Sequence, residues 1–147
     1  MARPQRYIAT EPLAPETLES EPKTGHPAYQ AYVLLYLGFI VAPVIAGLDK
    51  FANVLVDWPQ YLAPIVPATL GIAPQTMMLA VGVVEVAAGL LVAMKPSVGG
   101  WIVAAWLGGI IVNLLLIPGY FDIALRDLGL LLGALALARL GRHFESR

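Results

Sequence analysis

The chain has 147 residues, of which 59% are hydrophobic and 13% charged, and its net charge is -1. This composition is more apolar than that of an ordinary soluble domain, and the near-neutral charge leaves no basic surface for nucleic acid. The absence of cysteine excludes disulfides, thiolate metal sites, iron–sulfur clusters and covalently attached c-type haem. The composition therefore predicts a membrane protein.

The first thirty residues are rich in proline and glutamate and precede any apolar run. They lack the apolar core of a cleavable signal peptide. A segment of this kind buries too little apolar surface to offset the entropy of ordering. We therefore expect a flexible tail over residues 1–30, and the alternative is a strap that orders on a partner.

Four apolar stretches follow, each close to the ~20 residues that a spanning helix needs. They cover residues 31–48, 74–94, 98–117 and 123–140. Runs of Leu, Val, Ala and Gly dominate, without the period-two alternation of an outer-membrane barrel. We predict an all-α polytopic membrane protein with a four-transmembrane-helix bundle over residues 31–141 and a short C-terminal tail over residues 142–147.

The loop between the first two spans, residues 49–73, carries Trp58, Tyr61 and several prolines. The prolines interrupt any run of spanning length, and the aromatic residues suit a membrane surface. We expect an interfacial hairpin or a short surface helix there.

The distribution of Lys and Arg predicts the orientation. With four spans, seven of the nine fall on one side: Arg3, Arg6, Lys23, Lys95, Arg139, Arg142 and Arg147. The positive-inside rule then places both termini in the cytoplasm and residues 49–73 on the outer side.

Small residues recur at helical spacing in every predicted span, and such residues let two helices approach closely. The glycines for which we predict helix packing are Gly38, Gly82, Gly89, Gly108, Gly129 and Gly133. Gly82 and Gly89 flank Glu85 on one helix face, so Glu85 is expected to point at a neighbouring helix.

Charged residues within the spans are informative because lipid penalises them. Glu85 lies near the middle of the second span, whereas Arg126 and Asp127 lie roughly 5 to 10 Å beneath the outer end of the fourth. Asp49 and Lys50 mark the outer end of the first span. We expect Arg126 to be the hub of this group, neutralising Asp127, Asp122 or Glu85.

Two interpretations of the charged group stay open. It could be an internal network that fixes the helices in register. Alternatively it is a site where Glu85 exchanges a proton with a bound quinol, next to Arg126 and Asp127. In that case we expect the ligand to meet Asn113, Trp58, Trp106, Tyr120, Asp49 and Lys50. The aromatic residues could instead belong to interfacial belts.

Several chemistries have no support in the sequence. The histidines, His26 and His143, lie outside the spans and cannot form a facing pair for b-type haem. Phosphate-binding loops, nucleophile elbows and zinc-protease motifs are absent. We expect no intrinsic metal or cofactor and no enzyme activity of the chain on its own.

Three segments resemble DoxX/DoxD-like four-helix membrane proteins: GLDKF at residues 47–51, VGVVEVAAGLLV at 81–92 and ALRDLGLLLGALAL at 124–137. The resemblance covers about 110 residues, everything after the N-terminal tail. It implies a small integral subunit. In some members of that family the subunit is the membrane partner of a quinone-reducing sulfur oxidoreductase or a quinol oxidase, and in others it is associated with redox and detoxification enzymes.

The sequence therefore leads to two main hypotheses. The first is an accessory subunit that stabilises a larger, redox- or quinone-linked membrane complex, such as a respiratory or photosynthetic one. The second is a quinone-interacting subunit that binds quinone or lipid within the bundle. A small transporter is a weaker third, since it would need to form a homo-oligomer and no inverted repeat is present. We expect a multi-pass protein in the cytoplasmic membrane of a bacterium or archaeon.

Overall fold

The computed structural model describes residues 25–145. It contains the helices α1 (Pro27–Ala52), α2 (Ile65–Leu70), α3 (Pro74–Met94), α4 (Pro96–Leu115) and α5 (Phe121–Glu145), and a 3-10 turn, η3 (Trp58–Tyr61). These residues include no strand, which confirms the predicted all-α class. Most of the tail predicted over residues 1–30 lies outside the described part, and α1 already begins at Pro27.

Proline and charge fix the helix ends. Pro27, Pro74 and Pro96 each occupy the first turn of a long helix, where the missing N–H costs no hydrogen bond. Lys95 alone separates α3 from α4, so these two helices meet in a tight reversal. Helix α5 has Asp122 in its first turn and basic residues in its last, which suits the helix dipole. It continues to Glu145, so residues 142–145 are helical where the sequence predicted a tail.

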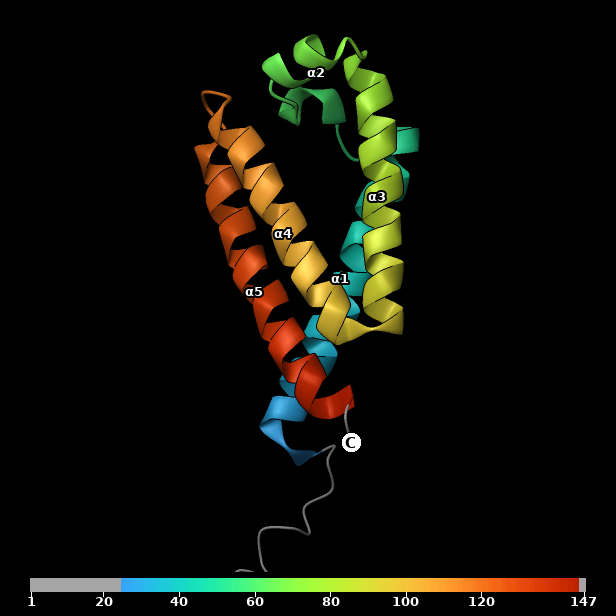
Figure 1. The fold of residues 1–147 in the computed structure, drawn as a ribbon, viewed down its shortest axis with the longest axis vertical. Helices are drawn as coiled ribbons and strands as arrows, with labels where there is room; N and C mark the ends of the chain where they lie inside the picture. Colours follow the sequence, from blue (N-terminus) through green and yellow to red (C-terminus); the bar gives the residue numbers. More distant parts are fainter. Residues whose placement is uncertain (1–24, 146–147) are drawn as a thin grey trace, which may run out of the picture.

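The four long helices form two pairs, α1 with α3 and α4 with α5 (Figure 1). The pairs lie close together at the end that contains Lys95 and Glu145, which we call the closed end. They diverge towards the opposite end, where residues 53–73 and 116–120 form the connections, and we call this the loop end. Helices α3 and α4, and α1 and α5, have fewer contacts than the members of each pair.

The hydrophobic core lies towards the closed end. Its buried members come from α3, α4 and α5 and are Ala88, Val92, Val103, Ala104, Ala134 and Leu137. Glycines let the backbones approach there: a Cβ atom at Gly100 would lie 2.8 Å from the carbonyl oxygen of Ala134. Glu145 ties α5 to the start of α4 by accepting hydrogen bonds from the backbone N–H and the hydroxyl of Ser97.

Within residues 25–145, three helices, α1, α3 and α4, are long and apolar enough to cross a membrane. Helix α5 is long enough, but every 18-residue window of it contains at least three charged residues. The lateral surface of the described helices is rich in exposed large apolar side chains. On α1 they recur at helical spacing, as Leu34, Leu37, Val41, Ile45 and Leu48. Such a surface suits lipid and identifies a multi-pass membrane protein.

The predicted packing glycines fall into two groups. A Cβ atom at Gly82 or Gly89 would lie 2.6 or 2.7 Å from atoms of α1, and Gly133 lies against Phe39. Gly108 has looser surroundings, and no atom lies within 4 Å of a Cβ built at Gly38 or Gly129. Gly38 and Gly129 therefore do not bring helices together within this chain, in contrast to the prediction.

Candidate functional site

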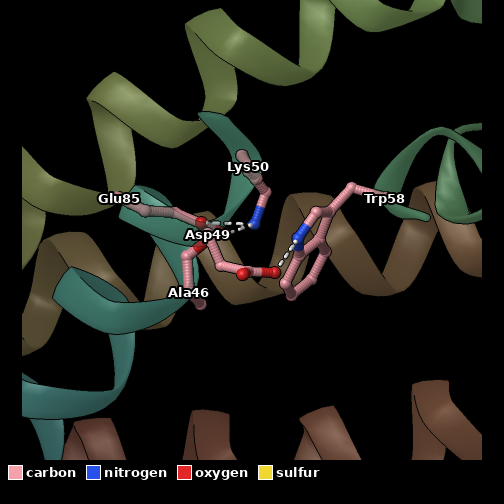
Figure 2. A network of polar contacts seen from close by, with 5 residues as sticks. All are labelled: Ala46, Asp49, Lys50, Trp58 and Glu85. Carbon is pink, nitrogen blue, oxygen red and sulfur yellow. Dashed lines mark hydrogen bonds and ion pairs between the residues drawn. The ribbon is translucent and has the colours of Figure 1, made fainter. Parts of the chain in front are cut away.

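The polar centre of the molecule is an ion pair between α1 and α3. Lys50 Nζ lies 2.5 Å from Glu85 Oε2, and the side chains are 3% and 11% exposed (Figure 2). Lys50 also donates to the carbonyl oxygen of Ala46 at 3.4 Å. The ammonium lies 3.6 Å from the ring centre of Trp58, so a cation–π contact covers another side of it.

Two glycines explain why this pair forms. Gly47 and Gly82 face each other where the antiparallel helices α1 and α3 cross, because a Cβ atom on either would lie 2.6 Å from the other's carbonyl oxygen. Lys50 and Glu85 each follow their glycine by three residues, on the same helix face. Helical side chains lean towards their own N-terminus, so in antiparallel helices these two side chains lean towards each other.

Asp49 organises the segment that follows α1. Its carboxylate accepts hydrogen bonds from the backbone N–H groups of Val54 and Leu55 and, at 2.8 Å, from the indole Nε1 of Trp58. These bonds hold Trp58 over Lys50 (Figure 2). Asp49 was predicted to bind a ligand, but its oxygens are engaged by the chain's own donors. Its contribution in the structure is to position Trp58.

A cavity of about 910 Å³ lies between the two helix pairs and beneath the loop-end connection. All four long helices line it, and most of its wall is apolar. The side chains that supply polar or aromatic character are Phe39, Lys50, Trp58, Tyr61, Glu85, Trp106, Asn113, Arg126 and Asp127. The structure therefore gathers around one cavity most of the residues that the sequence singled out on separate spans.

Asn113 closes the loop end of this cavity. Its side-chain amide donates to the carbonyl oxygen of Tyr61 at 2.6 Å and accepts from the backbone N–H of Ala63 at 2.9 Å. Both partners belong to the connection between α1 and α3, which thereby becomes attached to α4. Asn113 was predicted to meet a ligand, and its amide is instead engaged by this connection.

Trp106 supplies a polar atom without a partner. Its indole Nε1 is buried and forms no hydrogen bond within residues 25–145. The indole lies near the Glu85 carboxylate, but it does not reach hydrogen-bonding geometry. A buried donor without an acceptor costs about 1–3 kcal/mol. Trp106 lines the cavity with other atoms of its side chain, because Nε1 itself is covered.

Arg126 is not the hub that the sequence predicted. Its side chain is 68% exposed, and its Nε lies 3.5 Å from Oδ1 of the adjacent Asp127. Glu85 pairs with Lys50 instead. The difference arises from the stagger of the helices: Lys50, assigned to the outer end of its span, lies opposite the middle of α3. The lengths of the predicted spans do not determine this axial offset between α1 and α3.

Tyr120 lies at the edge of the site and does not line the cavity. Its hydroxyl lies 3.4 Å from Gln60 Oε1, and its ring contacts Tyr61 edge-on, with ring centres 5.4 Å apart.

The sequence did contain a signal for the pairing of Lys50 with Glu85. Both follow a glycine by three residues, as G-x-x-K on one span and G-x-x-E on the next.

Comparisons with protein-family models, with curated proteins and with solved structures find no match to this chain.

Proposed function

We propose that this chain is an integral membrane protein that holds a lipid-soluble molecule of the quinone class in the cavity between its four long helices, as a subunit of a larger redox complex. The main observation that supports this proposal is the cavity. Its volume of about 910 Å³ lies in the range of small-molecule sites, which also combine apolar walls with a few polar groups.

The polar groups of the cavity fit a quinone head. A quinone presents carbonyl oxygens, and the guanidinium of Arg126, which lines the cavity and is 68% exposed, is an accessible donor. Trp58 and Tyr61 offer aromatic faces, and Glu85 offers a carboxylate that could exchange a proton with a quinol. The long apolar wall suits an isoprenoid or alkyl tail.

The proposal includes a fourth membrane crossing by α5. Leu125, Leu128 and Leu132 recur at helical spacing on α5 and are 71%, 44% and 59% exposed, which suits lipid. The charged residues of its second turn, Arg126 and Asp127, line the cavity near the loop end. Arg126 is close enough to the helix end to extend its side chain towards the membrane surface.

The subunit character rests on the sequence. The spans contain no cysteine and no histidine, so a redox partner would have to accept or deliver the electrons. The resemblance to DoxX/DoxD-like proteins also favours a subunit of a redox complex. The competing proposal is an accessory role in assembly alone. In that case the charged group is an internal network that fixes the helices in register.

Isolation of the tagged protein from its native membranes in mild detergent tests these proposals. Mass spectrometry should identify co-purifying redox proteins and a stoichiometric amount of extracted quinone. Partner proteins without quinone would favour the accessory role. A lone oligomer that retains quinone would contradict the subunit part of the proposal, and recovery of neither would contradict both.

A further inference from the structure

We propose that the cavity binds an anionic phospholipid at an opening between α1 and α5, with the lipid phosphate on Arg126 and an acyl chain in the opening. Five exposed residues of the cavity wall form this opening, which we call the α1–α5 mouth: Leu34, Gly38 and Ala42 of α1, and Arg126 and Leu130 of α5. The ligand of this site is a component of the bilayer itself, so the site goes beyond the proposed quinone.

The packing of α1 against α5 explains why the mouth is open. The two helices meet at Gly133, where a Cβ atom would lie 3.3 Å from the ring of Phe39. Leu130 and Arg126 precede Gly133 by three and seven residues, so they lie on the same face of α5, which is the face towards α1. From this contact the helix pairs diverge towards the loop end (Figure 1). On α1, no atom lies within 4 Å of a Cβ built at Gly38.

Arg126 has donors available at this mouth. Its side chain is 68% exposed, and its ion pair with Asp127 joins Nε to Oδ1 at 3.5 Å. That contact engages one edge of the guanidinium and leaves the edge formed by the two Nη groups for a ligand. Because Asp127 is buried, a phosphate that approaches from the lipid side meets the guanidinium before it meets the carboxylate.

The place of Arg126 along α5 suits the phosphate level of a bilayer. Arg126 follows Phe121, the first residue of the helix, by five residues, which is a rise of about 8 Å. Its side chain leans towards the N-terminus of α5, at the loop end, and so towards the membrane surface. The neighbouring Leu125 and Leu128 are 71% and 44% exposed. An arginine among lipid-facing leucines favours an anionic partner, and a phosphate accepts two parallel hydrogen bonds from it.

The rest of the mouth fits an acyl chain. Leu34 and Leu130 are apolar and are 73% and 46% exposed, and the small residues Gly38 and Ala42 leave room beside them. The other cation of the cavity wall, Lys50, is 3% exposed and bound to Glu85, so it offers an anionic head no competing site.

A lipid at the mouth also has a consequence for the proposed quinone. Arg126 is the donor suggested for a quinone carbonyl, so a phosphate on the same guanidinium should lower the amount of quinone that the chain retains. This consequence rests on the proposed function, whereas the lipid site itself does not.

Lipid binding is measured by native mass spectrometry of the full-length chain in a non-ionic detergent, titrated with phosphatidylglycerol. We expect Arg126→Gln to weaken phosphatidylglycerol binding about fivefold. Arg139→Gln is the matched control, because Arg139 is an exposed arginine of the same helix that does not line the cavity. It removes the same charge and should change the affinity less than about twofold. Thermal melting checks that both variants are folded.

A second pair of variants tests the acyl chain. Open space surrounds both Gly38 and Gly129, but only Gly38 lines the cavity. The ring of Gly38→Phe would occupy the mouth, so phosphatidylglycerol binding should fall several-fold, whereas Gly129→Phe should leave it unchanged.

The outcomes separate this inference from the proposed function. Unchanged phosphatidylglycerol binding in Arg126→Gln or in Gly38→Phe, or equal losses in Arg126→Gln and Arg139→Gln, would overturn the lipid site and leave the quinone proposal standing. Lipid binding with the expected losses, in a chain that retains no quinone, would support the lipid site and contradict the proposed function.

Discussion

Lys50 carries a charge into the packed region between α1 and α3, and its environment compensates that charge on several sides. Glu85 provides the opposite charge, Ala46 a carbonyl oxygen and Trp58 an aromatic face. Asp49 holds Trp58 in place through its indole N–H. These residues form one unit, so the loss of any one charge should be costly.

We expect Lys50→Met to lower the free energy of unfolding by about 3–5 kcal/mol, because it leaves the Glu85 carboxylate buried without a partner. The double substitution Lys50→Met with Glu85→Met should recover most of that loss. Denaturant unfolding in a mixed micelle, followed by tryptophan fluorescence, gives the comparison.

Arg126→Met is the matched control, since the Arg126 side chain is 68% exposed and its ion pair should contribute less than about 1 kcal/mol. Equal losses for Lys50→Met and Arg126→Met would show that burial of the Lys50 pair has no energetic consequence.

The crossing of α1 and α3 depends on glycine. Gly82→Ala would place a Cβ atom 2.6 Å from the backbone oxygen of Gly47, where neither helix can shift without moving the ion pair. We expect a loss of about 1–3 kcal/mol from this overpacking, measured as a lower melting temperature.

Gly38→Ala, on α1, controls for helix propensity. Open space surrounds Gly38, so the alanine should be neutral or should stabilise the helix by up to about 1 kcal/mol. If the two alanines had the same effect on melting, close contact at Gly82 could not be the cause.

The connection between α1 and α3 is held by Asn113. Asn113→Leu removes both hydrogen bonds to that connection, so amide hydrogen exchange over residues 53–73 should increase while exchange at the closed end stays unchanged. Tyr120→Phe, which removes only an exposed 3.4 Å contact with Gln60, should have little effect. Unchanged exchange in Asn113→Leu would mean that the connection is held by other contacts.

The sequence predicted the elements better than their mutual placement. The long apolar runs located α3 and α4 to within about two residues. Gly82 and Gly89 correctly indicated the face on which Glu85 meets a neighbour. The partner of Glu85 was not predicted, because the axial offset between α1 and α3 depends on which glycines of the two helices come into contact. The sequence of one span alone does not determine that offset.

The Gly129 and Gly133 pair illustrates the same difficulty. Gly133 packs against Phe39 of α1, whereas open space surrounds Gly129, and α5 approaches α4 through Ala134, Ala138 and Gly141. A small-residue motif shows where helices can approach, and the shape of the neighbour decides where they do. The sequence did predict Trp106 as a ligand contact, but it gave no sign of the unpaired N–H, because a buried donor without an acceptor is recognised only once its surroundings are known.

For the whole molecule, the absence of cysteine allows a direct test of topology with introduced thiols. Pro118→Cys, between α4 and α5, should react with a membrane-impermeant maleimide added to intact cells. Arg139→Cys, near the other end of α5, should react only after the membrane is permeabilised. Labelling of both positions from the same side would contradict a crossing by α5.

A substitution at Gly109 tests the claim that the cavity between the helix pairs holds a quinone-class ligand. Gly109 lines the cavity, and open space surrounds both it and Gly129, which does not line the cavity. Quinone retained by the purified chain should fall several-fold in Gly109→Phe, where the ring occupies the cavity, and should not change in Gly129→Phe. Equal retention by Gly109→Phe and the unaltered chain would contradict the claim.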